Sequence, residues 1–140
     1  MLGALIFGSA LANDVLKPNL PQVQRAPEWV LCGVPAGEAV AMAGGDTRAG
    51  LRREGESRIA CFHRQPEGAS HPHFNALVYS LDTLIPVVSL EMQGYWIPDD
   101  SHPRGWWVRL YLWLHIALGW ALTLLAVAGF SGLIRLDNTR

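Results

Sequence analysis

A chain of 140 residues has room for one domain, and a formal net charge of −1 leaves it without the basic stripe that nucleic-acid binding requires. We therefore exclude a nucleic-acid partner and expect a small accessory protein or a piece of a larger one. Six tryptophans are many for this length, and they are considered below with the longest apolar run.

The first twelve residues (1–12), MLGALIFGSALA, are apolar and end in Ala10-Leu11-Ala12, a small-residue pattern that signal peptidase accepts. No Lys or Arg supplies the charged start of a signal peptide. Three interpretations stay open: a cleaved signal peptide, a membrane-embedded helix remnant or short anchor, or a segment with neither role.

Residues 13–73 form a loop-rich extramembrane segment, because prolines, glycines and charged residues interrupt every long pattern. Within it we predict short strands over Glu28–Val34 and Ser57–Phe62. A turn or two of helix is expected over Ala36–Ala43, stopped by Gly44-Gly45-Asp46. Seven acidic and seven basic residues make the segment neutral and well solvated.

Cys32 and Cys61 are the only cysteines, and both lie in this segment. An even number in an exported, core-poor region favours a disulfide, which would close a loop of about 30 residues and contribute about 3 kcal/mol. The alternative is two reduced cysteines in the cytoplasm.

His63, His71 and His73 lie close together in sequence and near Cys61. Nitrogen and sulfur donors of this kind bind zinc or copper, but the spacing matches no recognised ligand pattern. We therefore predict solvated loop histidines and no metal site.

Phe74 to Leu90 carries apolar residues at helical spacing on one face and Asn75, Tyr79 and Asp82 on another. An insertion gain of about 4 kcal/mol is offset by the central carboxylate and by Pro86, which should end the helix. We predict an amphipathic helix that is re-entrant or lies in the membrane interface, followed by an exit from the membrane that completes residues 74–100.

Asp82 is the most suggestive residue of this helix, because a carboxylate at membrane level is costly unless it meets a base, a helix N-terminus or water. Three roles stay open: a structural hydrogen bond or salt bridge, a contact with an ion or proton, and exposure at the interface. Asn75 and Tyr79 are the other candidate polar contacts in the membrane.

Leu110 to Ile134 is a run of 25 residues in which His115 is the only strongly polar side chain, with Arg109 and Arg135 at its ends. Its twelve Leu, Ile, Val and Phe residues offer about 5 kcal/mol of insertion energy. We predict a transmembrane helix in residues 101–140 with a short tail. The approach to it carries candidates for an interfacial aromatic belt, Trp96, Trp106, Trp107 and Trp113.

Two features of this span suggest contacts. His115 is predicted to bond to a neighbouring helix or to reach toward the interface, and the alternative is ligation of a cofactor such as haem. Small residues at intervals of four, seven and four stack along one face, which favours packing against another helix; they are Ala117, Ala121, Ala128 and Gly132.

The charges that flank the span do not decide its orientation, since two arginines lie on each side. The two cysteines and the possible export signal favour an extracytoplasmic loop segment and a cytoplasmic C-terminus.

The stretches FNALVYSLDTLIPVVSLEMQGYWIPD and YLWLHIALGWALTLLAVAGFSGLIRLD resemble the C-terminal membrane module of a group of uncharacterised bacterial membrane proteins. The resemblance covers the last 67 residues and implies a fold and a bacterial inner membrane, but no activity. Some relatives are described as membrane-associated oxidoreductases, although no residue here supports a redox reaction. A fainter likeness links YSLDTL to the pore helix of two-helix cation channels, but IPVV stands where their filter would be.

The fold class is therefore a mainly α membrane protein, and three functions follow. A structural subunit or anchor, whose partners are the lipid bilayer and other membrane helices, is the leading one. A pore-like oligomer and a cofactor-carrying electron-transfer subunit are the alternatives. The sequence holds no nucleophile elbow, P-loop, dinucleotide motif or pair of catalytic carboxylates, so we expect neither an enzyme nor a bound cofactor.

Overall fold

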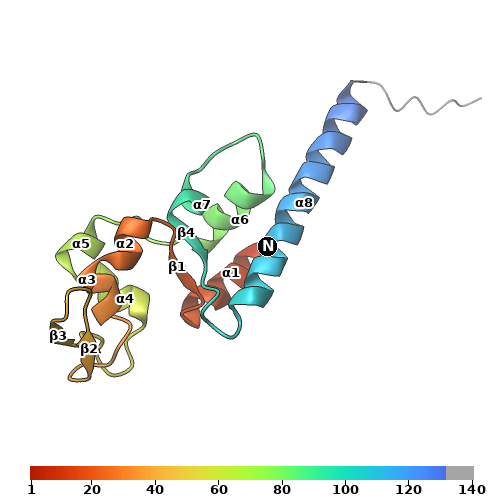
Figure 1. The fold of residues 1–140 in the computed structure, drawn as a ribbon. Coiled ribbons are helices and arrows are strands. Elements are labelled where there is room, and N and C mark those ends of the chain that lie inside the picture. Colours follow the sequence, from red (N-terminus) through yellow and green to blue (C-terminus); the bar gives the residue numbers. More distant parts are fainter. Residues whose placement is uncertain (132–140) are drawn as a thin grey trace, which may run out of the picture.

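The computed structural model describes residues 1–131 and is mainly helical. Figure 1 shows two regions joined by a short strand pair. We call residues 21–73 the disulfide lobe, and we call α1, α6 and α8 with their connections the helical module. The elements in chain order are α1 (Leu2–Ala12), β1 (Leu16–Pro18), α2 (Pro21–Arg25), α3 (Pro27–Leu31), β2 (Ala39–Ala41), β3 (Thr47–Ala49), α4 (Arg58–His63), α5 (Pro66–Ala69), α6 (Ala76–Leu84), α7 (Met92–Tyr95), β4 (Trp96–Pro98) and α8 (Gly105–Phe130).

In the helical module α6 packs against both α1 and α8, and α1 makes a smaller contact with α8. Gly3, near the start of α1, lies against Ser80 of α6 and His115 of α8. Asn13, just past the end of α1, accepts a hydrogen bond from Arg104, just before α8 begins. The N-terminal helix therefore runs antiparallel to α8 and covers only its first half.

In the same module α6 runs parallel to α8. Ser80 contacts His115, and one turn later the backbone of Leu84 lies against Gly119. Strand β1 pairs antiparallel with β4 and connects this module to the disulfide lobe.

In the disulfide lobe the predicted strands over Glu28–Val34 and Ser57–Phe62 are wrong, because α3 and α4 occupy these segments. Pro27 starts α3 at a position where a missing N–H is harmless. Ser57 caps α4 by accepting a hydrogen bond from the Ala60 N–H. Local helix-start signals thus outweighed the apolar composition on which the strand predictions rested.

The predicted helix over Ala36–Ala43 is also wrong, because β2 pairs there with β3 in an antiparallel hairpin. The predicted break at Gly44-Gly45-Asp46 is the turn. Gly44 and Gly45 have φ angles of 117° and 89°, a region that glycine enters without strain. The turn chemistry, rather than the alanines before it, decides the local structure.

The predicted disulfide is confirmed. Cys32 and Cys61 are bonded, with their Cα atoms 5.6 Å apart, and both are fully buried. Around them Trp29 packs edge-to-face on Phe62, and the guanidinium of Arg58 lies 4.0 Å from the Trp29 ring centre. This small aromatic core and the crosslink together hold short elements that have few other contacts.

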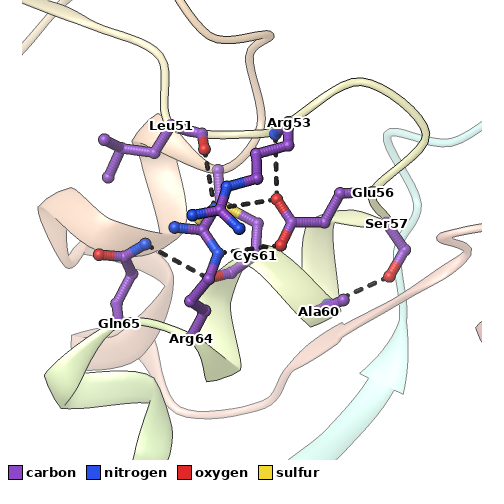
Figure 2. A network of polar contacts seen from close by, with 9 residues as sticks. Leu51, Arg53, Glu56, Ser57, Ala60, Cys61, Arg64 and Gln65 are labelled. Carbon is purple, nitrogen blue, oxygen red and sulfur yellow. Dashed lines mark hydrogen bonds and ion pairs between the residues drawn. A yellow bond between two sulfur atoms is a disulfide. The ribbon is translucent and has the colours of Figure 1, made fainter.

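A polar network closes the lobe beside the disulfide (Figure 2). The Arg64 guanidinium donates to both carboxylate oxygens of Glu56 and to the Leu51 carbonyl. The hydrogen bond from Arg64, helped by the Arg53 N–H, lowers the pKa of Glu56 to about 2. The loop over residues 51–56 is thereby tied to α4.

The amphipathic helix predicted over Phe74–Leu90 is shorter than expected, since α6 covers only nine residues. Asn75 caps it by accepting hydrogen bonds from the Leu77 and Val78 N–H groups. It ends before Pro86, as predicted. Its re-entrant or interfacial character stays a prediction.

The long apolar helix is present, but α8 begins at Gly105 rather than at Leu110, and Arg109 therefore lies inside it. The described helix ends at Phe130, and the predicted span continues into residues outside the described part. It is long and apolar enough to cross a membrane. Figure 1 shows that its C-terminal half projects beyond every other labelled element.

The predicted aromatic belt is wrong for Trp96, which is fully buried in β4. Trp106, Trp107 and Trp113 are exposed on α8. The first and last of these rings pack edge-to-face, 5.7 Å apart.

Candidate functional site

The contact between α1, α6 and α8 brings together several of the residues singled out from the sequence. At its centre His115 is 8% exposed, and its Nε2 lies 3.1 Å from the Ser80 carbonyl oxygen and 3.3 Å from the Ser80 hydroxyl. Its Nδ1 lies 3.4 Å from the Tyr111 hydroxyl. A tautomer in which Nε2–H donates to the carbonyl and Nδ1 accepts from Tyr111 satisfies both ring nitrogens.

This geometry gives His115 a structural contact of the predicted interhelical kind. A cofactor could reach a ring nitrogen only by displacing Ser80 or Tyr111. Gly3 closes the third side, because a Cβ there would collide with the Ser80 hydroxyl. Close helix approach through a glycine, with a polar contact beside it, is typical of helix packing in an apolar environment.

Aromatic rings surround this polar contact. Phe7 of α1 is fully buried and packs edge-to-face on Tyr79, Tyr111 and His115, at 4.7, 5.5 and 5.8 Å. Tyr79, predicted as a polar membrane contact, is fully buried, and among the described residues its hydroxyl has no hydrogen-bond partner. The ring therefore contributes packing rather than a membrane-facing polar group.

Asp82 meets a helix N-terminus, one of the partners that would make its charge tolerable. Its carboxylate accepts hydrogen bonds from the Leu90 N–H at 2.6 Å and the Gln93 N–H at 2.8 Å. Gln93 lies in the first turn of α7, and Glu91 before it has a φ of 61°. Asp82 thus closes the loop between α6 and α7.

Two open hollows flank this loop. A groove of about 700 Å³ has Asn19, Asp82 and Glu91 among its lining residues, and a hollow of about 380 Å³ lies between the loop and Trp120 of α8. Within residues 1–131 no group of three or more His, Cys, Asp or Glu side chains could hold a metal ion. Of the two hollows only the smaller one borders α8.

The face of small residues predicted on α8 is not the face that packs within the chain. Ala117 and Ala121 are exposed and Ala128 is half-buried, while Gly132 lies outside the described residues. The helix packs instead through a different set, Gly105, Leu112, His115 and Gly119. At 100° per residue the three alanines lie on roughly the opposite side of the helix.

Sequence reasoning missed Gly3, Ser80 and Gly119, which set the closest helix contacts. The spacing of His115 and Gly119, one turn apart, was a usable signal, since a polar and a small residue share one helix face there. Comparison with protein-family models, curated proteins and solved structures found no match.

Proposed function

We propose that this chain is a membrane-anchored structural subunit, in which α8 crosses a bilayer and the disulfide lobe lies on the extracytoplasmic side. The observation that carries the proposal is an inverted helical module. Apart from Leu112 of α8, its helices bury small, polar or aromatic residues against one another, and most of their leucines are exposed. A water-soluble bundle has the opposite arrangement.

The inversion is clearest in α6. Its buried residues are Tyr79, Ser80 and Thr83, whereas Leu77 is 53% and Leu81 is 39% exposed. Full burial of a leucine is worth about 1.5 to 3 kcal/mol. In water Leu77 and Leu81 forgo part of this energy, and an apolar surrounding would supply it.

The same inversion holds in the other two helices. α1 buries Gly3, Phe7 and Ala10 and exposes Leu2 and Leu5. Along α8 the exposed large apolar residues include Leu114, Leu118, Trp120, Leu122, Leu124, Leu125, Val127 and Phe130. An apolar surface of this length on a projecting helix is explained by lipid or by another apolar helix.

The depth of the module follows from its charges. The loop after α6 carries an exposed Glu91, which is costly in hydrocarbon. We therefore place α6 in the interface, together with the turns of α8 that it contacts at His115 and Gly119. The described part of α8 beyond this contact, from Trp120 to Phe130, then enters the hydrocarbon.

This placement also bears on the N-terminal segment. Phe7 fills the centre of the module, so a chain that lost α1 would uncover Tyr79 and His115. That contact favours a retained short anchor over a cleaved signal peptide.

Neither alternative function is supported by a particular contact. Both nitrogens of His115 are engaged within the chain, and both oxygens of Asp82 hold the loop before α7. We therefore propose neither a cofactor-carrying subunit nor a pore.

Two measurements test the proposal. Membranes from expressing bacteria should retain the chain after alkaline carbonate washing and release it only with detergent. In intact cells an impermeant maleimide should label Arg48→Cys in the lobe but should label Ser131→Cys only after lysis. The native cysteines do not react because they form a disulfide. Release by carbonate contradicts the anchor, and the reverse labelling contradicts the orientation.

The subunit role is tested by the mass of the complex in mild detergent. Ala121→Leu should weaken assembly because it fills the free small-residue face, whereas Ala126→Leu, on another side of the helix, should not. A monomeric wild-type chain in mild detergent would contradict the subunit role and leave the anchor intact.

A further inference from the structure

Three histidines gather where the disulfide lobe meets the helical module. His63 ends α4, and His71 and His73 lie between α5 and α6. The ring of His71 packs edge-to-face on Trp96 of β4 at 5.0 Å, and the His63 ring centre lies 6.1 Å from the same tryptophan. The Trp96 indole N–H donates to the Pro72 carbonyl at 3.0 Å. The joint between the two regions is therefore made of imidazole and indole rings.

Two of these imidazoles each hold a buried nitrogen that has no partner among the described residues. The His63 Nδ1 lies 2.9 Å from the Gly68 carbonyl oxygen, so Nδ1 carries the proton and Nε2 holds a lone pair. Among the described residues the buried Nε2 atoms of His63 and His71 have no hydrogen-bond partner. The prediction of solvated loop histidines is therefore wrong for His71, which is 7% exposed because it packs against aromatic rings. A lone pair left unpaired costs far less than a buried N–H⁺ without an acceptor.

The neighbouring imidazoles disfavour protonation of this pair, because two imidazolium charges at these distances would repel one another. His73 stacks on His63 at 4.0 Å, and the ring centres of His63 and His71 are 6.3 Å apart. From α7 the ring of Tyr95 contacts His71, and from α4 that of Phe62 does so.

The charged side chains of α4 and β1, and Arg64 just after α4, have other partners. Arg58 stacks on Trp29, Arg64 pairs with Glu56, and Lys17 pairs with Asp99. Among residues 1–131 none of the ion pairs includes a histidine. Within the described residues, no carboxylate is therefore paired with an imidazole at this joint.

We propose that His63 and His71 form an acid-sensitive latch, which holds the disulfide lobe against β4 while both rings are neutral and releases it when either takes up a proton. The latch does not depend on whether α8 crosses a membrane. Its consequence is that the lobe's position relative to the helical module follows the pH of the compartment that contains it.

The sign follows from proton linkage. Burial lowers the pKa of both His63 and His71 below the ordinary 6.5, so the closed state binds fewer protons than the open one. The latch is fully closed above about pH 6.5 and loses stability as the pH falls through that value. The opening constant rises by up to about tenfold per pH unit for each proton taken up.

The test uses the full chain in detergent with 5-fluorotryptophan, and the ¹⁹F resonance of Trp96 is assigned with Trp96→Phe. Between pH 7.5 and 5.0 this resonance should move toward its solvent-exposed position and gain a solvent isotope shift. In His63→Asn/His71→Phe, which keeps a donor to Gly68 and a ring on Trp96, the response should disappear. His102→Gln, outside the cluster, should keep it.

An unchanged Trp96 resonance in the wild type would overturn the latch, as would the same response in the double variant. If the double variant does not fold, imidazole NMR of the wild-type chain decides. Titration of His63 and His71 below pH 6.5, in step with the Trp96 change, supports the latch, and titration at or above 6.5 overturns it.

Discussion

The disulfide lobe and the helical module are stabilised in different ways. The lobe has short elements and a small core, and it relies on the Cys32–Cys61 bond and the Arg64–Glu56 network. The module has no crosslink and is held by close helix contacts at Gly3 and Gly119. The proposed membrane anchor accounts for this difference. In a polar surrounding a small domain is stabilised by a disulfide, and in an apolar one helices associate through small residues and a buried polar contact.

The largest loss of stability should come from removing the disulfide. Replacing Cys32 and Cys61 with serine should lower the free energy of unfolding of the lobe by about 3 kcal/mol, because the open chain regains loop entropy. Urea unfolding followed by limited proteolysis in residues 21–73 measures this. Protection of α8 should not change, and equal loss in both regions would contradict the division between them.

The module should instead be sensitive to a single methyl group. In Gly119→Ala the added Cβ collides with the Leu84 carbonyl, and separating α6 from α8 should cost about 1 to 3 kcal/mol. Gly129→Ala is the matched control, since nothing lies within 4 Å of its Cβ. Thermal unfolding in detergent compares the two variants. Equal melting temperatures would contradict a stabilising contact between α6 and α8.

A smaller loss of stability is expected from a change at the start of α6. Asn75→Ala removes the acceptor for two backbone N–H groups and should cost about 1 kcal/mol. Asn75→Asp keeps the cap and should be nearly neutral. Hydrogen exchange at Leu77 and Val78 reports the difference, and a cap role is contradicted if alanine leaves their exchange unchanged.

The smallest expected effect is the dependence of the stability of the disulfide lobe on acidic pH. The Arg64 hydrogen bond holds the pKa of Glu56 near 2 instead of 4.5, so this carboxylate stabilises the lobe above about pH 4.5 and ceases to do so as the pH falls toward 2. Carboxyl NMR should find this depressed titration. Glu56→Gln should flatten the acid dependence of lobe unfolding in that window, and a Glu56 titration near 4.5 would count against the network.

The sequence predicted best where a pattern is long or covalent. The apolar run in α8, the Cys32–Cys61 pair and the stop before Pro86 all depend on local or compositional signals. It predicted poorly where three or four residues decide, as in α3, α4 and the β2–β3 hairpin. There a proline, a capping serine or a glycine turn outweighs the average propensity of the segment.

The candidate site was predicted in part for a physical reason. His115 and Asp82 stand out because a polar group in an apolar run is conspicuous. Their partners do not, because Ser80 and the Leu90 N–H lie on other segments and only the packing brings them close. The inward direction of Tyr79 and Thr83 was also hidden, since helical spacing alone does not say which face meets protein.

The central claim is that hydrocarbon surrounds the exposed face of α8, and nitroxide scanning in lipid bilayers tests it most directly. Labels at Leu122, Leu125 and Val127, which are exposed beyond the contact with α6, should be highly accessible to oxygen and shielded from a water-soluble nickel complex. A label at Arg48 in the lobe should behave in the opposite way. High nickel accessibility at all three α8 positions would contradict the account.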